Sequence, residues 1–171
     1  DITCGFLVPT MLYRLLDSEA LDRADISSLR TMIYGAAPMS PSRLEQGLDR
    51  FGPVFMQAYG QTETSVSVTV LGKAEHNTAR PDRLESCGTP LVGNQVKVFD
   101  DHDEEVDDGE VGEICVRGPL VMEEYWKKPE ETQITLRGGW LHTGDMARRD
   151  PDGYLTIVDR KNDMIISGGF N

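Results

Sequence analysis

Residues 31–63 read TMIYGAAPMSPSRLEQGLDRFGPVFMQAYGQTE, and this stretch decides the fold. Its apolar run Thr31–Tyr34 ends at a glycine and indicates a buried strand that leads into a loop. Ser40 followed by Pro41 marks a helix start, because a proline in the first helical turn sacrifices no hydrogen bond. Apolar residues at helical spacing follow, and the run Val54–Tyr59 predicts the next strand. Strand, loop, helix and strand in this order are typical of a parallel α/β sheet.

The second half of the sequence has a different pattern. Gln95–Phe99 and Glu113–Arg117 alternate apolar with polar residues, and Tyr154–Val158 is a third β run. Glycines and prolines separate these runs at short intervals, as they do in small antiparallel β structures. We therefore predict an α/β fold class, with part of a mixed or parallel α/β subdomain over residues 1–89 and a small distorted antiparallel β-barrel subdomain over residues 90–160.

The net charge of the chain limits the classes of partner that it can bind. Its 171 residues include 17 basic and 29 acidic side chains, which gives a formal net charge of −12. Such a chain offers few cations to phosphates, and this argues against nucleic acid and against anionic membrane surfaces as partners. Eight of the acids lie in Asp100–Glu110. That segment lacks the glycine and the glutamate that a calcium-binding loop requires, so we interpret it as a solvated turn between two strands.

Membrane and disulfide signals are weak. No apolar stretch approaches the roughly 20 residues that span a bilayer, and no leader peptide opens the sequence. Cys4, Cys87 and Cys115 are too few for a disulfide framework or a paired Cys-x-x-Cys metal site. Reduced thiols favour a cytoplasmic location. Both ends look cut, so we expect a piece of a longer protein, in which an uncovered apolar face would favour self-association.

Four glycine-containing loops follow or flank the predicted strands, where ligands bind in open α/β sheets. They are Gly35–Pro38, Tyr59–Glu63, Thr143–Asp145 and the segment from Asp159-Arg160 to Ser167–Gly169. Small residues such as Ala36 and Ala37 let a backbone approach a flat ring closely. A threonine beside a carboxylate can bind a phosphate oxygen and Mg²⁺ respectively, as at Thr62 and Glu63. A carboxylate such as Asp145 can accept both hydroxyls of a ribose, so together these loops describe a nucleotide site.

Taken singly, each of these features has a simpler explanation. Gly-Asp and Asp-Pro-Asp-Gly sequences are ordinary turn chemistry. The three histidines read as loop or turn residues, and Tyr125 and Trp126 as packing residues. The sequence contains no Gly-x-x-x-x-Gly-Lys-[Ser/Thr] phosphate loop, no Gly-x-Ser-x-Gly elbow and no His-Glu-x-x-His motif. The residues alone thus favour a nucleotide- or phosphate-binding α/β segment.

Three ordered motifs closely resemble the adenylate-forming superfamily, which contains acyl-CoA synthetases, peptide-synthetase adenylation domains and firefly luciferase. They are YGQTE at 59–63, GWLHTGD at 139–145 and DRKNDMIISGG at 159–169. The resemblance covers essentially the whole chain, and the third motif looks like the fatty-acyl or aryl-CoA ligase branch. It implies that the chain is an internal piece of the large N-terminal domain, with residues 161–171 beginning the hinge to a further C-terminal domain.

The resemblance implies a two-step reaction. A fatty or aryl carboxylate attacks the α-phosphate of MgATP to give an acyl-adenylate and pyrophosphate, and the thiol of coenzyme A then displaces AMP. Because the protein does little covalent work, catalysis should consist of positioning and charge stabilisation around the phosphate.

The resemblance also implies roles for individual residues. Glu63 would hold Mg²⁺, Thr62 would bind the α-phosphate, and Asp145 would grip the ribose hydroxyls with Arg160 nearby; we expect Thr62, Glu63 and Arg160 to form the catalytic set. The remaining positions are expected to bind the adenine (Gly35, Ala36, Ala37, Pro38 and Tyr59), to border the acyl pocket (Gly60 and the Gly35 loop) and to lie against the pantetheine tunnel (Gly168 and Gly169).

The sequence departs from the family pattern at one position and leaves alternatives open. Asn162 stands where the family usually has an aspartate or lysine hinge residue. The family's loop over the β- and γ-phosphates and its C-terminal catalytic lysine have no counterpart in these residues, so we expect the chain not to complete the reaction alone. An adenylation domain that loads a carrier protein and a non-catalytic nucleotide-binding module remain alternatives. The identity of the acid is not specified.

Overall fold

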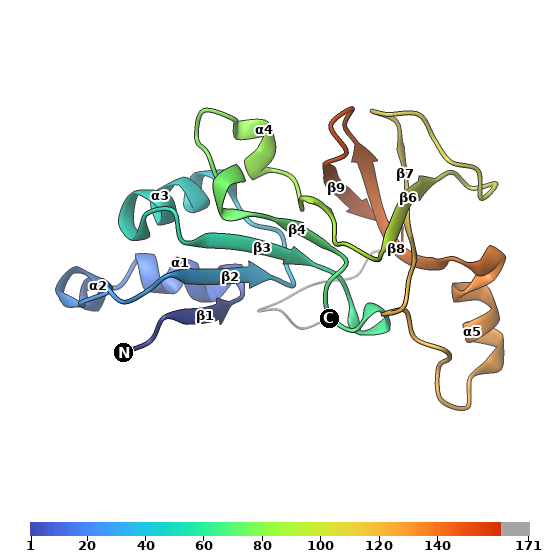
Figure 1. Cartoon of the computed structure of the whole chain (residues 1–171), viewed down its shortest axis with the longest axis horizontal. Coiled ribbons are helices and arrows are strands. Elements are labelled where there is room, and N and C mark those ends of the chain that lie inside the picture. The colour runs from blue at the N-terminus through green and yellow to red at the C-terminus, as the bar shows by residue number, and fades with distance from the viewer. Residues whose placement is uncertain (162–171) are drawn as a thin grey trace. The chain divides into compact units, whose positions relative to one another are not determined.

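The computed structural model of the chain describes residues 1–161 (Figure 1). Its described residues divide into two compact units, the first made of residues 1–58 and 71–86 and the second of residues 59–70 and 87–161. In the part of the chain that is described, none of the helices is both long and apolar enough to cross a membrane.

The first unit contains the predicted parallel α/β pattern. Parallel pairing joins β1 (Cys4–Leu7) to β2 (Thr31–Gly35) and β2 to β3 (Phe55–Tyr59). The helices of this unit are α1 (Pro9–Leu16), α2 (Glu19–Arg23), α3 (Pro41–Phe51), α4 (Pro81–Leu84) and the short 3₁₀ turn η2 (Lys73–Glu75). Proline occupies the first turn of α3 directly after Ser40, as the sequence predicts.

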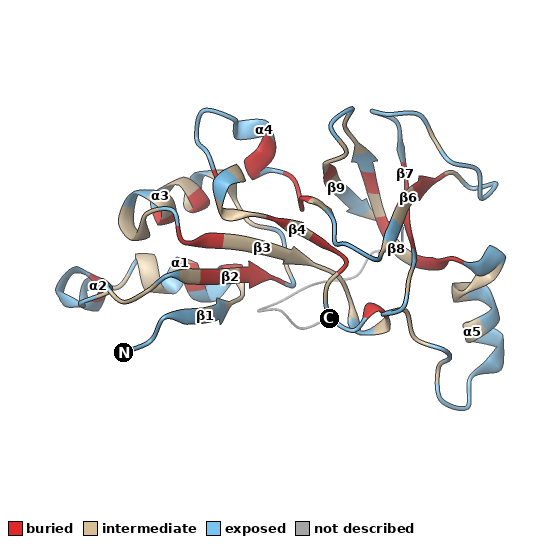
Figure 2. Ribbon diagram, viewed as in Figure 1, coloured by how far each residue is buried: buried red, intermediate tan, exposed pale blue. Residues whose placement is uncertain are grey.

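Helix α3 shows how the sequence builds the core of this unit. Leu44 is fully buried, and Leu48 and Phe51 pack against the same cluster, so the i, i+4, i+7 face points inward (Figure 2). Phe55 of β3 lies so close to Gly47 that a Cβ there would approach its ring to 2.9 Å. The glycine therefore lets helix and sheet pack in direct contact.

The second unit is built on an antiparallel sheet with the order β6-β7-β8-β9. These strands are β6 (Gln95–Phe99), β7 (Val111–Arg117), β8 (Leu141–Arg149) and β9 (Leu155–Arg160). Residues 89–161 also include helix α5 (Pro129–Thr135) and the 3₁₀ turn η3 (Arg137–Gly139). Ile114, Val116 and Leu141 are fully buried in the core of this sheet.

The predicted fold class is confirmed. The first sheet mixes parallel and antiparallel pairing in the order β1-β2-β3-β4-β5, where β4 (Thr69–Leu71) and β5 (Thr89–Pro90) pair antiparallel. A separate antiparallel sheet follows it along the chain. Over residues 1–161 this second sheet has two open edges, β6 and β9, and does not close into a barrel. Its distortion comes from register shifts in the β7·β8 and β8·β9 pairs.

The acidic segment Asp100–Glu110 connects β6 to β7, as predicted for a turn between strands. Part of its charge is balanced locally: Glu105 lies 2.6 Å from Lys97 Nζ and 2.8 Å from Arg149, and Asp108 lies 2.7 Å from Arg149. The turn thus carries most of the net charge without gathering its carboxylates around a common centre.

Candidate functional site

Three of the predicted site residues meet in the second unit. The Tyr59 hydroxyl donates a hydrogen bond to Asp145 Oδ2 at 2.7 Å, and Arg160 Nε lies 2.8 Å from Asp145 Oδ1. Asp145 in β8 and Arg160 at the end of β9 are paired residues of the same ladder. Each carboxylate oxygen therefore holds one of these two partners, and a carboxylate with about four lone-pair sites retains capacity for two sugar hydroxyls.

Asp145 is more enclosed than the sequence suggests for a ligand-binding carboxylate, because only 4% of the residue is exposed. Burial, together with the negative charge of Asp145, raises the pKa of Tyr59 well above its ordinary value. The Tyr59 hydroxyl therefore remains protonated and donates to Asp145 at neutral pH. Its ring packs against two apolar clusters of the second unit. Tyr59 therefore has a structural role in addition to the predicted contact with adenine.

The local structure around Asp145 is a distorted strand instead of the predicted loop. Gly144 has φ of 76°, a conformation that favours glycine. The Thr143 hydroxyl accepts a hydrogen bond from the Asp145 amide at 3.1 Å and donates one to the Ile114 carbonyl at 2.8 Å. Residues 141–149 nevertheless form one strand, β8. The sequence hides this strand because a glycine followed by an aspartate is typical of a turn.

Thr62 and Glu63 lie in the short 3₁₀ turn η1 (Thr62–Thr64). The buried hydroxyl of Thr64 accepts a hydrogen bond from the Gln61 amide and donates one to the Gln61 carbonyl, which closes the turn. A Cβ on Gly60 would come within 2.2 Å of the Val66 carbonyl oxygen. Only glycine fits where the loop folds back on itself. This close backbone contact explains why residue 60 is a glycine equally well as the predicted border with the acyl pocket does.

Tyr125 holds Glu63 in place, a contact that the sequence does not reveal. Its hydroxyl donates to Glu63 Oε1 at 2.7 Å, and the Met122 amide donates to the Glu63 carbonyl at 2.8 Å. Burial, followed by the hydrogen bond to Glu63 and its charge, raises the pKa of Tyr125 to about 12, so the tyrosine stays a donor. Tyr125, interpreted above as a packing residue, thus orients a predicted metal ligand.

The carboxylate of Glu63 fits a hard divalent cation. It is partly exposed, and within residues 1–161 its Oε2 atom has no protein partner and no lysine or arginine pairs with it. Mg²⁺ is commonly bound by one or two carboxylates together with water and phosphate oxygens. Glu63 meets this requirement, because Tyr125 fixes its Oε1 atom and its Oε2 atom can bind the cation.

The Gly35 loop belongs to the first unit. A Cβ on Gly35 would lie 2.2 Å from the Ala58 carbonyl oxygen, so glycine is required where β2 passes β3. Ala36 has φ of 64°, and both it and Pro38 are exposed while Ala37 is half-buried. Such a surface of backbone and small side chains can be approached closely by a flat ring. The predicted site residues Gly168 and Gly169, and the hinge position Asn162, lie outside the described residues.

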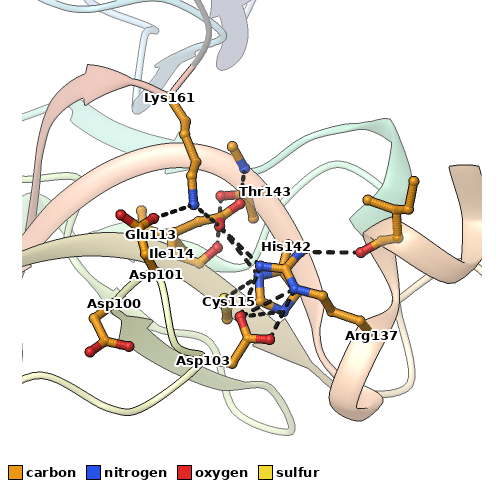
Figure 3. A network of polar contacts seen from close by, with 12 residues as sticks. Asp100, Asp101, Asp103, Glu113, Ile114, Cys115, Arg137, His142, Thr143 and Lys161 are labelled. Atoms are coloured by element: carbon orange, nitrogen blue, oxygen red, sulfur yellow. Dashed lines mark hydrogen bonds and ion pairs between the residues drawn. The ribbon is translucent and has the colours of Figure 1, made fainter.

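A second polar cluster, absent from the sequence predictions, includes His142 and Lys161 (Figure 3). At its centre is Glu113 of β7, a buried carboxylate that accepts a hydrogen bond from the Gly144 amide at 2.9 Å. Three more nitrogen atoms approach Glu113 Oε2: Lys161 Nζ and His142 Nδ1, each at 3.3 Å, and Arg137 at 3.7 Å. Burial alone would raise the pKa of Glu113, but the Gly144 amide, His142 and Lys161 together lower it below its ordinary value.

The donor atoms of Glu113, Cys115 and His142 lie within 4.8 Å of one another, which is close enough to consider a metal ion. The charges around it argue against one, because Lys161 and Arg137 already place two cations beside the carboxylate. Burial and the charge of Glu113 raise the pKa of Cys115 to about 12, so the group is a neutral thiol within this network. We therefore interpret this cluster as a hydrogen-bonded and ion-paired network.

Comparisons with known proteins identify relatives of this chain. A medium/long-chain-fatty-acid–CoA ligase of Mycobacterium tuberculosis is 51% identical over 170 residues, which cover 99% of this chain and 29% of the ligase. The solved structure of an amide bond synthetase from Marinactinospora thermotolerans matches with a TM-score of 0.93 at 43% identity, covering 99% of this chain and 34% of that one. The O-succinylbenzoate–CoA synthetase of Bacillus subtilis, solved with ATP and a magnesium ion, matches with a TM-score of 0.82 at 33% identity, covering 98% and 34%.

The chain thus spans about a third of the length of the relatives it matches. The predicted resemblance is confirmed, since the profile of the AMP-binding enzyme family matches residues 1–126, well over half of the chain. This 171-residue chain belongs to the AMP-binding enzyme family.

Proposed function

We propose that this chain supplies the ribose- and metal-binding residues of an AMP-forming acyl-CoA ligase about three times its length. The observation that carries the proposal is the geometry of the Asp145 carboxylate, which is held between the Tyr59 hydroxyl and Arg160. Asp145 and Arg160 face each other on two neighbouring strands. A fixed carboxylate with spare acceptor capacity is suited to a vicinal diol. The relatives include a fatty-acid–CoA ligase and an aryl-acid–CoA synthetase that binds ATP and magnesium.

In the proposed first step, this chain binds and orients the nucleotide. Asp145 accepts hydrogen bonds from the ribose hydroxyls, and Arg160, already fixed on the carboxylate, adds positive charge nearby. The exposed Thr62 hydroxyl precedes Glu63 in η1 and would donate to the α-phosphate. Such contacts place the phosphorus for in-line attack by the carboxylate substrate, so that positioning supplies the rate enhancement.

Glu63 is the proposed protein ligand of Mg²⁺. A metal bound there would supply charge neutralisation for the phosphate oxygens. Tyr125 keeps one Glu63 oxygen occupied and would leave the other for the cation. The Gly35–Pro38 loop is proposed to bind adenine through its exposed small residues, and Gly60 to border the acid. Coenzyme A remains the proposed acceptor, with a fatty or aryl acid as the acyl donor.

A second candidate function keeps the adenylation step and changes the acceptor. It is favoured by the 43% identity to an amide bond synthetase. The two candidates predict the same nucleotide site and differ only in the second half-reaction. Supplying the intact enzyme with preformed acyl-adenylate and either coenzyme A, an amine or a phosphopantetheinyl carrier protein would separate them.

The nucleotide site is tested by titrating the 171-residue chain with AMP and following its amide resonances. We expect shifts at Tyr59–Glu63 and Asp145, with 2′-deoxy-AMP producing smaller ones at Asp145. In the intact ligase, Asp145→Asn should raise the KM for ATP while acid binding is unchanged. An unchanged KM for ATP in this variant would remove Asp145 from the site.

A further inference from the structure

We propose that Glu113 is a positioning residue that fixes Asp145 and Arg160 together for ribose binding. The inference rests on the proposed function, in which these two residues bind the sugar. Glu113 binds the residue before Asp145, through the Gly144 amide at 2.9 Å, and the residue after Arg160, through Lys161 Nζ at 3.3 Å.

The two contacts lie on the same side of one rung of the sheet, at the position next to it along the ladder. Asp145 and Arg160 are paired across β8 and β9, and the Lys161 amide continues the ladder by donating to the Gly144 carbonyl at 2.8 Å. Glu113 belongs to β7, on the other side of β8. A single side chain from a third strand therefore binds both strands at the residues that adjoin the carboxylate and the guanidinium proposed to bind the sugar. Figure 3 shows its contact with Lys161.

Gly144 needs such an anchor. Its φ of 76° and the register shift between Glu113 and Cys115 remove it from regular pairing with β7. The carboxylate replaces the ladder hydrogen bond that the distorted backbone cannot make, since it accepts the Gly144 amide directly. A hydrogen bond to a charged acceptor is stronger than the backbone bond it replaces, so the distortion is held in one geometry.

The rest of the network holds Glu113 itself. His142 Nδ1 lies 3.3 Å from its Oε2, and Arg137 is held by two oxygens of Asp103 while approaching the same Oε2 at 3.7 Å. Only 4% of Glu113 is exposed. A buried carboxylate with this many donors has little rotational freedom, which is the property a positioning group requires.

The test uses the intact ligase and the ratio of kcat/KM for ATP to kcat/KM for 2′-deoxy-ATP. A general loss of stability lowers both values and leaves the ratio unchanged, whereas misplacement of Asp145 lowers the ratio. Glu113→Gln removes the charge that Lys161 and Arg137 face. We expect it to reduce the ratio about tenfold, the order of effect for a hydrogen bond to a charged group.

Glu105→Gln is the matched control. It makes the same chemical change in the neighbouring turn and also removes two ion pairs, to Lys97 and Arg149, but Glu105 has no contact with Gly144 or Lys161. We expect its ratio to equal that of the parent enzyme. If Glu113→Gln fails to fold, Lys161→Met is the second variant. It removes one ion-pair partner of Glu113, at a partly exposed position, and should also lower the ratio.

Asp145→Asn separates failure of this inference from failure of the proposed function. If Asp145→Asn retains the preference for ATP over 2′-deoxy-ATP, Asp145 does not bind the ribose and the proposed function is wrong at this site. If Asp145→Asn loses the preference while Glu113→Gln and Lys161→Met keep it, the nucleotide site stands and the positioning role of Glu113 is refuted.

Discussion

Replacing Tyr125 with phenylalanine removes one hydroxyl and tests how Glu63 is oriented. The hydroxyl donates to Glu63 Oε1 at 2.7 Å, and the tyrosine is half-buried. Hydrogen bonds to charged groups are worth about 1.5–3 kcal/mol. Because water can reach this site and replace part of the contact, we take about 1 kcal/mol, which corresponds to about a fivefold weaker hold on the proposed Mg²⁺.

The assay is pyrophosphate release by the intact ligase at saturating acid, with free Mg²⁺ varied at fixed ATP. Tyr125→Phe should raise the Mg²⁺ concentration required for half-maximal rate by about fivefold, whereas the rate at saturating Mg²⁺ should fall less, because the ligand itself is still present. Glu63→Gln should have the larger effect on both quantities.

A double-mutant cycle distinguishes orientation of Glu63 from a general effect of the substitution. In a Glu63→Gln background the hydroxyl of Tyr125 has no carboxylate to orient, so Tyr125→Phe should cause little further change in the Mg²⁺ dependence. Equal effects of Tyr125→Phe in the two backgrounds would refute the reasoning. So would an unaltered Mg²⁺ dependence in the single variant.

Three further outcomes follow from the geometry. Gly60→Ala should destabilise the chain and abolish adenylation, because its Cβ would meet the Val66 carbonyl at 2.2 Å; a variant with unchanged urea unfolding would contradict this. Because the pKa of Glu113 is lowered in the folded state, its ionisation stabilises the fold at pH values above the unfolded-state pKa of about 4.5. This contribution disappears as the pH falls through the folded-state pKa. The difference in unfolding free energy between the parent and Glu113→Gln should therefore narrow from pH 6 toward pH 3 in urea titrations. In the folded chain, a maleimide should label the exposed Cys4 and spare the buried Cys87 and Cys115, because burial raises the pKa of each of these two thiols to about 12. Peptide mapping of the labelled chain would show this, and early labelling of Cys115 would argue against the buried network.

The regular elements of this fold could be predicted because local patterns determine them. The helix after Ser40 has a proline at its start and an apolar face with period 3.6, and the structure places α3 there. The alternation in Gln95–Phe99 predicts β6 with its observed bounds. In both cases the residues that decide the element lie within a few positions of one another, so the sequence carries the whole signal.

The site could be predicted only in part, because its supporting contacts are long-range. The motif residues Tyr59, Asp145 and Arg160 stand out in the sequence, and the structure brings them together. By contrast, Glu113 meets Gly144 across 31 positions, and no local pattern distinguishes it from any other polar residue in an alternating strand. Tyr125 meets Glu63 across 62 positions and reads as a packing residue for the same reason.

The missed strand β8 explains why the proposed ribose carboxylate does not stand in a loop. A flexible loop would let Asp145 rotate away from the sugar, and each binding event would have to order it again. Here the chain stays in a strand on both sides of Gly144, while the positive φ of that glycine and the register shift set the strand out of regular pairing at one point. The pairing of Asp145 with Arg160 across β8 and β9, and the hydrogen bond from Tyr59, keep the carboxylate in place beside this distortion. Groups on regular elements hold their geometry better than groups on loops, so a carboxylate on a distorted strand can be fixed before a ligand arrives.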